Sequence, residues 1–183
     1  MNDSLFTGTL VRLAAQDPAA DAQTISNWRR DTIYTRWLEV DPVLPPQLKQ
    51  TRERIERPHS ERFYPFAIRA LADDKLIGFV ILMRINYVHG DAYVGIGIGE
   101  SEYRSKGYGT DAMKLILRFA FQELNLHRVS LDAVATNARA IRSYEKCGFV
   151  HEGQTRGAEF RGGIRDDIVA MGILREEWEM RGK

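Results

Sequence analysis

A basic, glycine-rich turn lies between a predicted strand and a predicted helix in the middle of the chain. Its residues are Arg104, Ser105, Lys106, Gly107, Tyr108 and Gly109, and the helix follows from Thr110. Glycine lets several backbone N–H groups point at one place, and a helix N-terminus adds partial positive charge there. The spacing therefore predicts a site for a phosphate or pyrophosphate. An ordinary tight turn is the alternative that spacing alone leaves open.

A second group of polar residues lies on the predicted helix that follows Asn137. Asn137, Ile141 and Tyr144 fall on one face of this helix, because residues three or four apart are neighbours on a helix surface. A phenol and an amide thus stand at either end of an apolar stripe. This arrangement can contact a ligand, although a tyrosine that is simply part of the core gives the same pattern.

The glycine turn also fits the dinucleotide fingerprint G-x-G-x-x-A over Gly107–Ala112, with Asp132 downstream at about the expected distance. Two features oppose a nicotinamide enzyme. Residues 101–106 separate the first glycine from the preceding strand, whereas a dinucleotide fold places that glycine directly after the strand. The upstream half also reads as hairpins and not as alternating strands and helices.

Periodicity and turn signals in the sequence predict the strands and helices that surround these residues. Strands are predicted at 7–13, 63–70, 76–85, 93–99, 128–135, 149–155 and 167–174. Helices are predicted near 21–29 and at 47–57, 110–124 and 138–147, and a loop is predicted around 157–165. The first four strands should be antiparallel neighbours, with two helices inserted after the first. The fold class is therefore α+β, with a mixed, mostly antiparallel central sheet flanked by helices.

Composition narrows the functional classes. The chain of 183 residues has 44% hydrophobic residues, 28% charged residues and a net charge of +1, which suits one domain over 1–183 and gives no electrostatic case for nucleic acid or membrane binding. Cys147 is the single cysteine, so an internal disulfide and a multi-cysteine metal site are excluded, and no metal is expected. The first residues do not resemble a secretory signal, and we expect a cytoplasmic protein.

The two polar groups together resemble the GNAT superfamily of acetyl-CoA-dependent N-acetyltransferases. The resemblance rests on Arg104-x-x-Gly107-x-Gly109, then a helix, a strand and Asn137…Tyr144-Glu-Lys-Cys-Gly-Phe149. It covers nearly the whole chain, and the predicted order of elements is the one that the superfamily has. Further segments look like the branch of ribosomal-protein alanine and spermidine acetyltransferases: Leu126-His-Arg128, Asn137-x-x-Ala140, Glu159-Phe-Arg-x-Gly163 and Leu174–Trp178.

The resemblance implies a role for each group. Amides of residues 104–109 and the helix start at Thr110 would hold the pyrophosphate of acetyl-CoA, which is the co-substrate. Backbone near Ile98 would pair with pantetheine and polarise the thioester carbonyl, and Asn137 would hydrogen-bond the cofactor arm. Tyr144 would protonate the departing thiolate as a general acid. No motif supports an acyl-cysteine intermediate at Cys147.

The acceptor would be a small-molecule amine or a peptide N-terminus, and it must lose a proton before attack because amines are mostly ammonium at neutral pH. Glu100, at the exit of the central strand, is the first candidate base and Asp132 the second, while Glu102 and His127 are weaker. The turn at 86–91, the loop at 157–165 and, above all, the helices of residues 21–57 should wall the acceptor site. Their mixture of Arg29, Arg30, Arg36, Arg52 and Arg54 with Asp31, Glu39, Asp41, Glu53 and Glu56 does not separate a polyamine, an aminoglycoside, an amino sugar and a protein N-terminus.

A non-catalytic CoA-binding module remains an alternative, because a fold can persist after its chemistry is lost. A homodimer is expected only at the level of the family.

Overall fold

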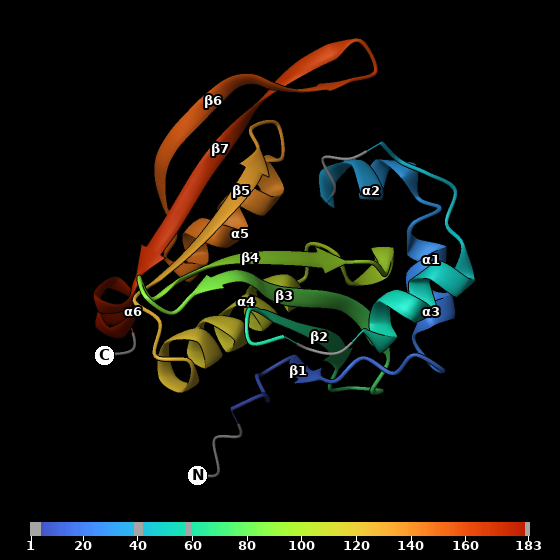
Figure 1. Cartoon of the computed structure of the whole chain (residues 1–183), viewed down its shortest axis with the longest axis horizontal. Coiled ribbons are helices and arrows are strands. Elements are labelled where there is room, and N and C mark those ends of the chain that lie inside the picture. Colours follow the sequence, from blue (N-terminus) through green and yellow to red (C-terminus); the bar gives the residue numbers. More distant parts are fainter. Residues whose placement is uncertain (1–4, 39–41, 58–59, 182–183) are drawn as a thin grey trace.

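The computed structural model describes residues 5–38, 42–57 and 60–181. Within this part of the chain, seven strands form one sheet in the order β1-β2-β3-β4-β5-β7-β6 (Figure 1). The strands are β1 (Val11–Ala14), β2 (Phe63–Ala70), β3 (Leu76–Asn86), β4 (Asp91–Ile98), β5 (Arg128–Val134), β6 (Val150–Arg161) and β7 (Ile164–Leu174). The helices are α1 (Ala22–Trp28), α2 (Thr32–Leu38), α3 (Leu48–Glu56), η1 (Ser101–Tyr103), α4 (Tyr108–Arg118), η2 (Phe119–Glu123), α5 (Ala138–Cys147) and α6 (Arg175–Arg181).

The predicted α+β fold is confirmed. Strands β1 to β4 form an antiparallel run, β4 pairs with β5 in parallel, and β7 pairs antiparallel with both β5 and β6. The prediction of four consecutive antiparallel strands is therefore correct. The dinucleotide alternative is wrong at the level of topology, because the glycine turn follows an antiparallel meander and the short helix η1.

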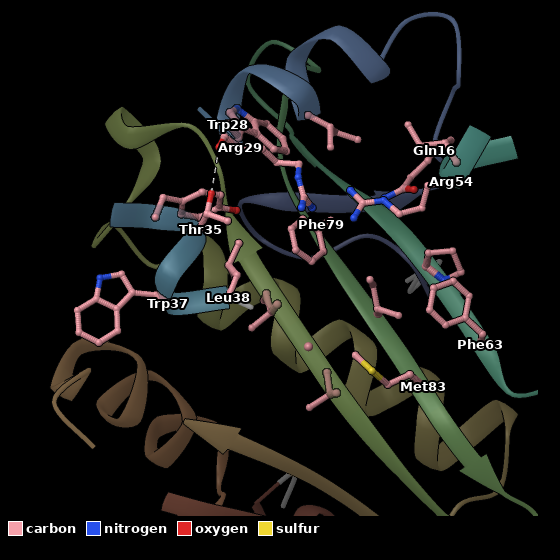
Figure 2. A pocket seen from close by; sticks show the side chains of 18 of the residues that line it. Gln16, Trp28, Arg29, Thr35, Trp37, Leu38, Arg54, Phe63, Phe79 and Met83 are labelled. Carbon is pink, nitrogen blue, oxygen red and sulfur yellow. Dashed lines mark hydrogen bonds between the residues drawn. The ribbon is translucent and has the colours of Figure 1, made fainter. Parts of the chain in front are cut away.

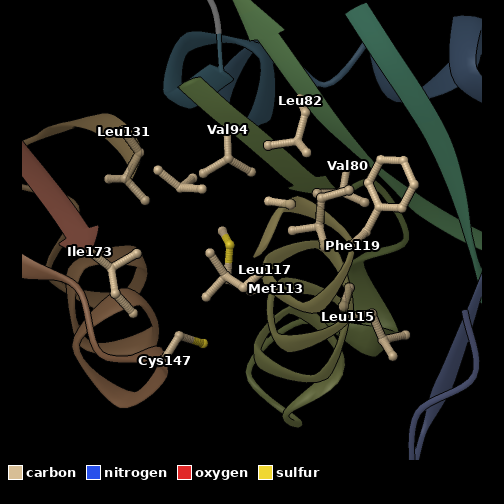
Figure 3. Close-up of a cluster of buried hydrophobic side chains, with 14 of the residues drawn as sticks. Val80, Leu82, Val94, Met113, Leu115, Leu117, Phe119, Leu131, Cys147 and Ile173 are labelled. Carbon is tan, nitrogen blue, oxygen red and sulfur yellow. The ribbon is translucent and has the colours of Figure 1, made fainter. Parts of the chain in front are cut away.

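Apolar side chains of α4 pack against the sheet and form the main core, as the apolar periodicity of this helix predicts. Ala112, Met113 and Ile116 are fully or almost fully buried and belong to one cluster with residues of the strands. Figure 3 shows Met113 in this cluster with Val80, Leu82 and Val94. Burying each large side chain contributes roughly 1.5–3 kcal/mol. The predicted helix does not continue regularly, because its last turn widens into the π-helical segment η2, where the N–H of Leu124 donates to the carbonyl of Phe119.

A second, smaller apolar cluster lies on the other face of the sheet, beneath α1, α2 and α3. It contains Ile25, Trp28 and Tyr34 from the helices with Ala67 and Leu76 from the strands. The sheet is thus covered on both faces, with α4 on one and the three N-terminal helices on the other (Figure 1).

The structure differs from the predicted strands and helices at four places, and each difference has a local cause. The first strand covers only Val11–Ala14, because the N–H groups of Leu10 and Val11 donate to the Asp111 carboxylate at 2.8 and 3.0 Å. Three helices precede β2 where two were predicted, since Asp31 accepts a hydrogen bond from the N–H of Tyr34 at 3.0 Å and caps the additional helix α2.

The other two corrections concern the C-terminal part. The predicted loop around 157–165 is mostly strand, because the turn is confined to Gly162 and Gly163, whose φ angles are +57° and +83°. The chain also ends with a helix that was not predicted, α6, where Glu177 accepts a hydrogen bond from the N–H of Leu174 at 2.9 Å. No helix in the described ranges has the length and apolarity that a bilayer crossing requires.

Candidate active site

The site begins where β4 and β5 separate. The two strands pair only at Asp91, Ala92 and Tyr93 of β4, and beyond these β5 pairs with β7 while β4 pairs with β3. The remainder of β4, residues 94–98, therefore faces β5 without joining it. Two cavities open along this stretch, and we call them the glycine-turn cavity and the aromatic cavity.

The glycine-turn cavity has a volume of about 360 Å³ and lies between the end of β4, the glycine turn and α5. Ser105 and Gly107 have positive φ angles of +63° and +92°, and Gly107 is the N-cap of α4. The first hydrogen bond of the helix runs from the N–H of Asp111 to Gly107, so the N–H groups of residues 108–110 have no intrahelical acceptor. This geometry is suited to an anion.

Arg104 holds the glycine turn on the end of β4. Its guanidinium donates to the carbonyls of Ile98 and Gly99 at 2.9 and 2.7 Å, and it lies 3.4 Å from the carboxylate of Asp31. It also stacks 4.6 Å from the ring centre of Tyr34. Arg104 therefore joins the glycine turn to α2, a role that the sequence does not reveal.

The other predicted cofactor-binding residues divide into two groups. Ile98, Arg104, Ser105, Gly107, Gly109, Thr110 and Asn137 line the glycine-turn cavity. Lys106 and Tyr108 are not among its lining residues, and the Tyr108 ring instead packs edge-on against Tyr103 at 5.1 Å.

Three basic residues of α5 also line this cavity, and the sequence interpretation missed them. Arg139, Arg142 and Lys146 lie on one side of α5, at intervals of three and four residues. That spacing in a basic helix was the available signal. Together with the first turn of α4, these side chains make the cavity electropositive.

Asn137 and Thr110 fix how α5 sits against α4. The side-chain oxygen of Asn137 accepts a hydrogen bond from the N–H of Ala140 at 3.2 Å and so caps α5. Thr110 and Ser143 share a hydrogen bond of 2.8 Å between their hydroxyl oxygens. The amide nitrogen of Asn137 keeps its donor capacity at the cavity.

Tyr144 lines both cavities, as do Tyr34, Trp37, Leu38 and Ile96. The two cavities therefore meet at this point, with Tyr144 at the junction. Burial raises the pKa of the Tyr144 phenol to about 12, so the hydroxyl keeps its proton at neutral pH. A protonated phenol at the junction of two cavities can donate a proton to a group that is bound there.

The aromatic cavity has a volume of about 380 Å³ and lies beneath α1, α2 and α3 (Figure 2). Its lining includes Gly95 on β4, which carries no side chain. Gly97 follows two residues later on the same face of the strand, and Gly99 lies directly beyond the end of β4. A Cβ atom at Gly99 would lie 1.9 Å from the Trp28 ring, and one at Gly97 would lie 2.5 Å from the Tyr34 hydroxyl oxygen.

The two candidate bases have different surroundings. Glu100 accepts a hydrogen bond from the Trp28 indole at 2.7 Å and pairs with Lys75 at 2.8 Å, and it does not line either cavity. Burial by itself would raise its pKa, but the hydrogen bonds from Lys75 and Trp28 hold the pKa below its usual value. Asp132 lies on β5 and lines the aromatic cavity with Tyr144.

The weaker candidates lie elsewhere. Glu102 pairs with Lys75 at 2.7 Å, and His127 directly precedes β5, at the end where β4 and β5 are joined. Cys147 is buried against α4, and burial raises the pKa of its thiol to about 11, which disfavours the thiolate that a nucleophile would need. Within residues 5–38, 42–57 and 60–181, no cluster of three acidic, histidine or cysteine side chains could hold a metal ion.

Comparison with known proteins gives a consistent assignment. Residues 11–150 match the family described as an acetyltransferase (GNAT) domain. The chain is 36% identical over 112 residues to spermidine N(1)-acetyltransferase of Vibrio cholerae, a match that covers 61% of this chain and 64% of the relative. It is 33% identical over 109 residues to a Bacillus subtilis protein named "Putative ribosomal N-acetyltransferase YdaF", covering 60% and 59% of the two chains. The matched segments thus span less than two thirds of these relatives.

Similarity to a solved structure extends further along the chain. The crystal structure of spermidine N-acetyltransferase from Vibrio cholerae in complex with CoA and spermine superposes with a TM-score of 0.83 and 27% identity. The match covers 92% of this chain and 98% of that one.

Proposed function

The chain belongs to the GNAT acetyltransferase family, and we propose that it transfers an acetyl group from acetyl-CoA to a primary amine. The observation that carries the proposal is the junction of two cavities at Tyr144. One cavity has the anion-binding geometry that a pyrophosphate requires, and the other is a separate space for an acceptor. A relative that binds CoA and spermine supports the same division.

The glycine-turn cavity suits CoA in charge and in backbone geometry. The N-terminus of α4 and the side chains of Arg139, Arg142 and Lys146 would bind its phosphate groups. The carbonyl of Ile98 accepts a hydrogen bond from Arg104 and therefore points away from β3. The N–H of Ile98 would point in the same direction, into the gap between β4 and β5. That N–H would pair with pantetheine and polarise the thioester carbonyl.

The proposed chemistry is a direct attack by the amine. The amine nitrogen forms a bond to the acetyl carbon, and the bond from that carbon to sulfur breaks. Asp132 accepts the proton that the amine loses, directly or through water, and Tyr144 donates its phenolic proton to the departing sulfur. Asp132 is preferred to Glu100 because it lines the acceptor cavity with Tyr144, whereas Glu100 is occupied by Lys75 and Trp28.

The test is thiol release from acetyl-CoA in the presence of single amines, together with titration of acetyl-CoA into the protein. We expect binding of acetyl-CoA and thiol release that depends on an amine. Asp132→Asn should lower kcat on the order of 100-fold or more and leave the affinity for acetyl-CoA unchanged. Asp166→Asn, on the adjacent strand β7, is the matched control and should retain activity.

Each result discriminates between the alternatives. Binding of acetyl-CoA without thiol release for any amine would favour a non-catalytic CoA-binding module. Full activity of Asp132→Asn with loss of activity in Glu100→Gln would move the base to Glu100.

A further inference from the structure

The end of β4 departs from regular strand geometry, directly after the N–H group of Ile98. The N–H groups of Gly99 and Glu100 both donate to the carbonyl of Ile77, at 2.9 and 3.2 Å. The carbonyls of Ile98 and Gly99 both accept from the Arg104 guanidinium, at 2.9 and 2.7 Å. Consecutive backbone groups of a regular strand point to opposite sides. These four hydrogen bonds therefore fix one irregular backbone conformation beside the N–H that would polarise the thioester.

This end of β4 also lacks a neighbouring strand on the side of the gap. Pairing with β5 includes only residues 91–93, so a second ladder does not fix the edge of residues 94–98. Arg104 binds this edge at the Ile98 carbonyl. The guanidinium thus gives the strand end a support that a paired strand would otherwise provide.

Helix α2 in turn supports the Arg104 side chain. The guanidinium stacks 4.6 Å from the ring centre of Tyr34 and lies 3.4 Å from the carboxylate of Asp31. Tyr34 is buried, and its N–H donates to Asp31 at 3.0 Å. The helix lies against β4, since the Tyr34 hydroxyl would be 2.5 Å from a Cβ atom at Gly97 (Figure 1). A planar guanidinium that is both stacked and paired has little freedom to move.

Asp31 belongs to the acidic residues that the sequence places in the acceptor wall, and its partner is a residue of the glycine turn. Glu53 lies 3.9 Å from Lys49 on α3, and Glu56 lines neither cavity. Glu39 and Asp41 lie outside the described residues.

Every nitrogen of the Arg104 guanidinium already has an acceptor in the protein. Nε donates to Ile98, Nη2 to Gly99 and Nη1 to Asp31. Positive charge for the phosphate groups of a cofactor is available instead from α5, whose three basic side chains line the glycine-turn cavity. The side chain of Arg104 is therefore committed to the backbone of β4.

We propose that Arg104 is a positioning residue: its side chain aligns the N–H of Ile98 with the thioester carbonyl, and it does not bind the cofactor phosphates. This inference rests on the proposed acetyl transfer. A displacement of about 1 Å in a reacting geometry can lower a rate roughly 100-fold, so a small shift of this strand end would reduce turnover.

The first experiment compares two substitutions of Arg104 in thiol release and in calorimetric titration with acetyl-CoA. Arg104→Lys keeps the charge but loses the planar fork, and Arg104→Gln loses both. Each should lower kcat about 10-fold to 100-fold and change the affinity for acetyl-CoA by less than about threefold. A phosphate-binding role predicts the opposite, with Lys retaining affinity and Gln losing it.

The matched control is Arg175→Gln. Arg175 also donates to a backbone carbonyl, that of Leu126, at 2.9 and 2.7 Å, but it lines neither cavity. This variant should retain kcat and affinity even if its stability falls as much as that of Arg104→Gln.

The second experiment measures the alignment directly. The infrared carbonyl band of bound acetyl-CoA, labelled with 13C at the thioester carbon, is recorded without amine. An N–H that donates to the carbonyl oxygen should displace this band to lower wavenumber than in free acetyl-CoA. The parent and Arg175→Gln should show the displacement, and Arg104→Gln should lose most of it. A purely stabilising role of Arg104 would not move the band in the folded variant.

A milder variant keeps the test decisive if Arg104→Gln does not fold. Asp31→Asn retains an acceptor for the N–H of Tyr34 but removes the charge that pairs with Arg104. It should lower kcat about threefold to tenfold, reduce the band displacement and leave the affinity for acetyl-CoA unchanged. Asp74→Asn is its control, because Asp74 pairs with Arg12 at 2.7 Å and lines neither cavity.

The outcomes separate this inference from the proposed function. If Arg104→Gln weakens acetyl-CoA binding about tenfold or more and keeps the kcat and the carbonyl band of the parent, the inference is overturned and acetyl transfer stands. A lowered kcat with an unchanged band would also overturn it. If the parent binds acetyl-CoA and releases no thiol with any amine, acetyl transfer is contradicted, and the infrared comparison alone decides the role of Arg104.

Discussion

The glycine-turn cavity and the aromatic cavity share Tyr34, Trp37, Leu38, Ile96 and Tyr144, but their other lining residues come from different parts of the chain. Apart from the shared residues, the first is formed by one stretch, 97–110, together with Asn137 and α5. The second is formed mainly by side chains from six elements, α1, α2, α3, β2, β3 and β4, spread over residues 16–96, with Asp132 and Tyr144 added. A site made of local backbone geometry leaves a sequence pattern, whereas a site made of dispersed side chains does not.

The two cavities would also recognise different chemical groups. N–H groups and basic side chains suit an invariant phosphate group. Apolar walls suit a particular body shape and change easily between relatives. We therefore expect the cofactor side to resemble the relatives more closely than the acceptor side does.

The junction residue should give the largest effect. Tyr144→Phe removes the phenolic proton and should lower kcat on the order of 100-fold to 10,000-fold, because general acids contribute that much. The affinity for acetyl-CoA, measured by calorimetry, should change little. A variant with normal kcat would show that the leaving sulfur needs no proton from Tyr144.

Tyr144 also predicts a pH dependence of stability. Its pKa in the folded protein is about 12, above the ordinary value of 10.0, because burial disfavours the phenolate. The stability that the neutral phenol contributes is therefore complete below pH 10 and is lost as the pH rises toward 12. Denaturation measured from pH 8 to 12 should show this loss in the parent and a smaller loss in Tyr144→Phe.

The position directly after β4 should tolerate no side chain beneath Trp28. Gly99→Ala places a methyl group against the Trp28 ring and should lower the free energy of unfolding by about 1–3 kcal/mol, measured in urea. Gly153→Ala is the control, since no atom lies within 4 Å of its added Cβ. Equal stability of the two variants would contradict the close packing of Trp28 on β4.

The basic side of α5 should act on the cofactor alone. Arg142→Ala should raise KM for acetyl-CoA about tenfold, because one charge-assisted contact is lost, and leave KM for the amine unchanged. The effect should diminish in high salt. Steady-state kinetics with each substrate varied separately distinguishes the two constants, and a raised KM for the amine would contradict the division between the cavities.

The smallest effect should come from Cys147. Cys147→Ala should leave kcat within about threefold of the parent, because the buried thiol has a pKa of about 11 and no thiolate forms at neutral pH. Intact-protein mass spectrometry after incubation with acetyl-CoA alone should detect no acetylated thiol. An acetyl adduct that disappears in Cys147→Ala would instead establish a covalent intermediate.

The sequence predicted the glycine turn and the strand order because both depend on local periods. Glycines at 107 and 109, alternating apolar residues and a helical stripe are each visible within a dozen residues. Gly148 is a local signal of the same kind, because it ends α5 with a φ angle of +105°, a left-handed conformation that favours glycine. The α5 basic residues also had a local pattern, but helical spacing of charges is common on solvated surfaces.

Tertiary structure alone assigned partners to the charged side chains. Arg104 has the position of a phosphate-binding residue in the sequence. Its guanidinium instead donates hydrogen bonds to the carbonyls of Ile98 and Gly99 and pairs with the carboxylate of Asp31. Glu100 has the position of a base, yet Lys75 and Trp28 occupy its carboxylate. Such partners lie 5 to 73 residues away in the chain, and no local pattern encodes a contact of that separation.

The family resemblance, the fold class and the glycine turn could all be predicted from the sequence, because each depends on the spacing of residues along the chain. The tertiary structure alone shows that apolar side chains from helices and strands enclose one cavity, and that Asp132 and Tyr144 both line it. The physical reason is that a cavity is a property of surfaces brought together by packing. Its shape and charge exist only after helices α1 to α3 close over the sheet.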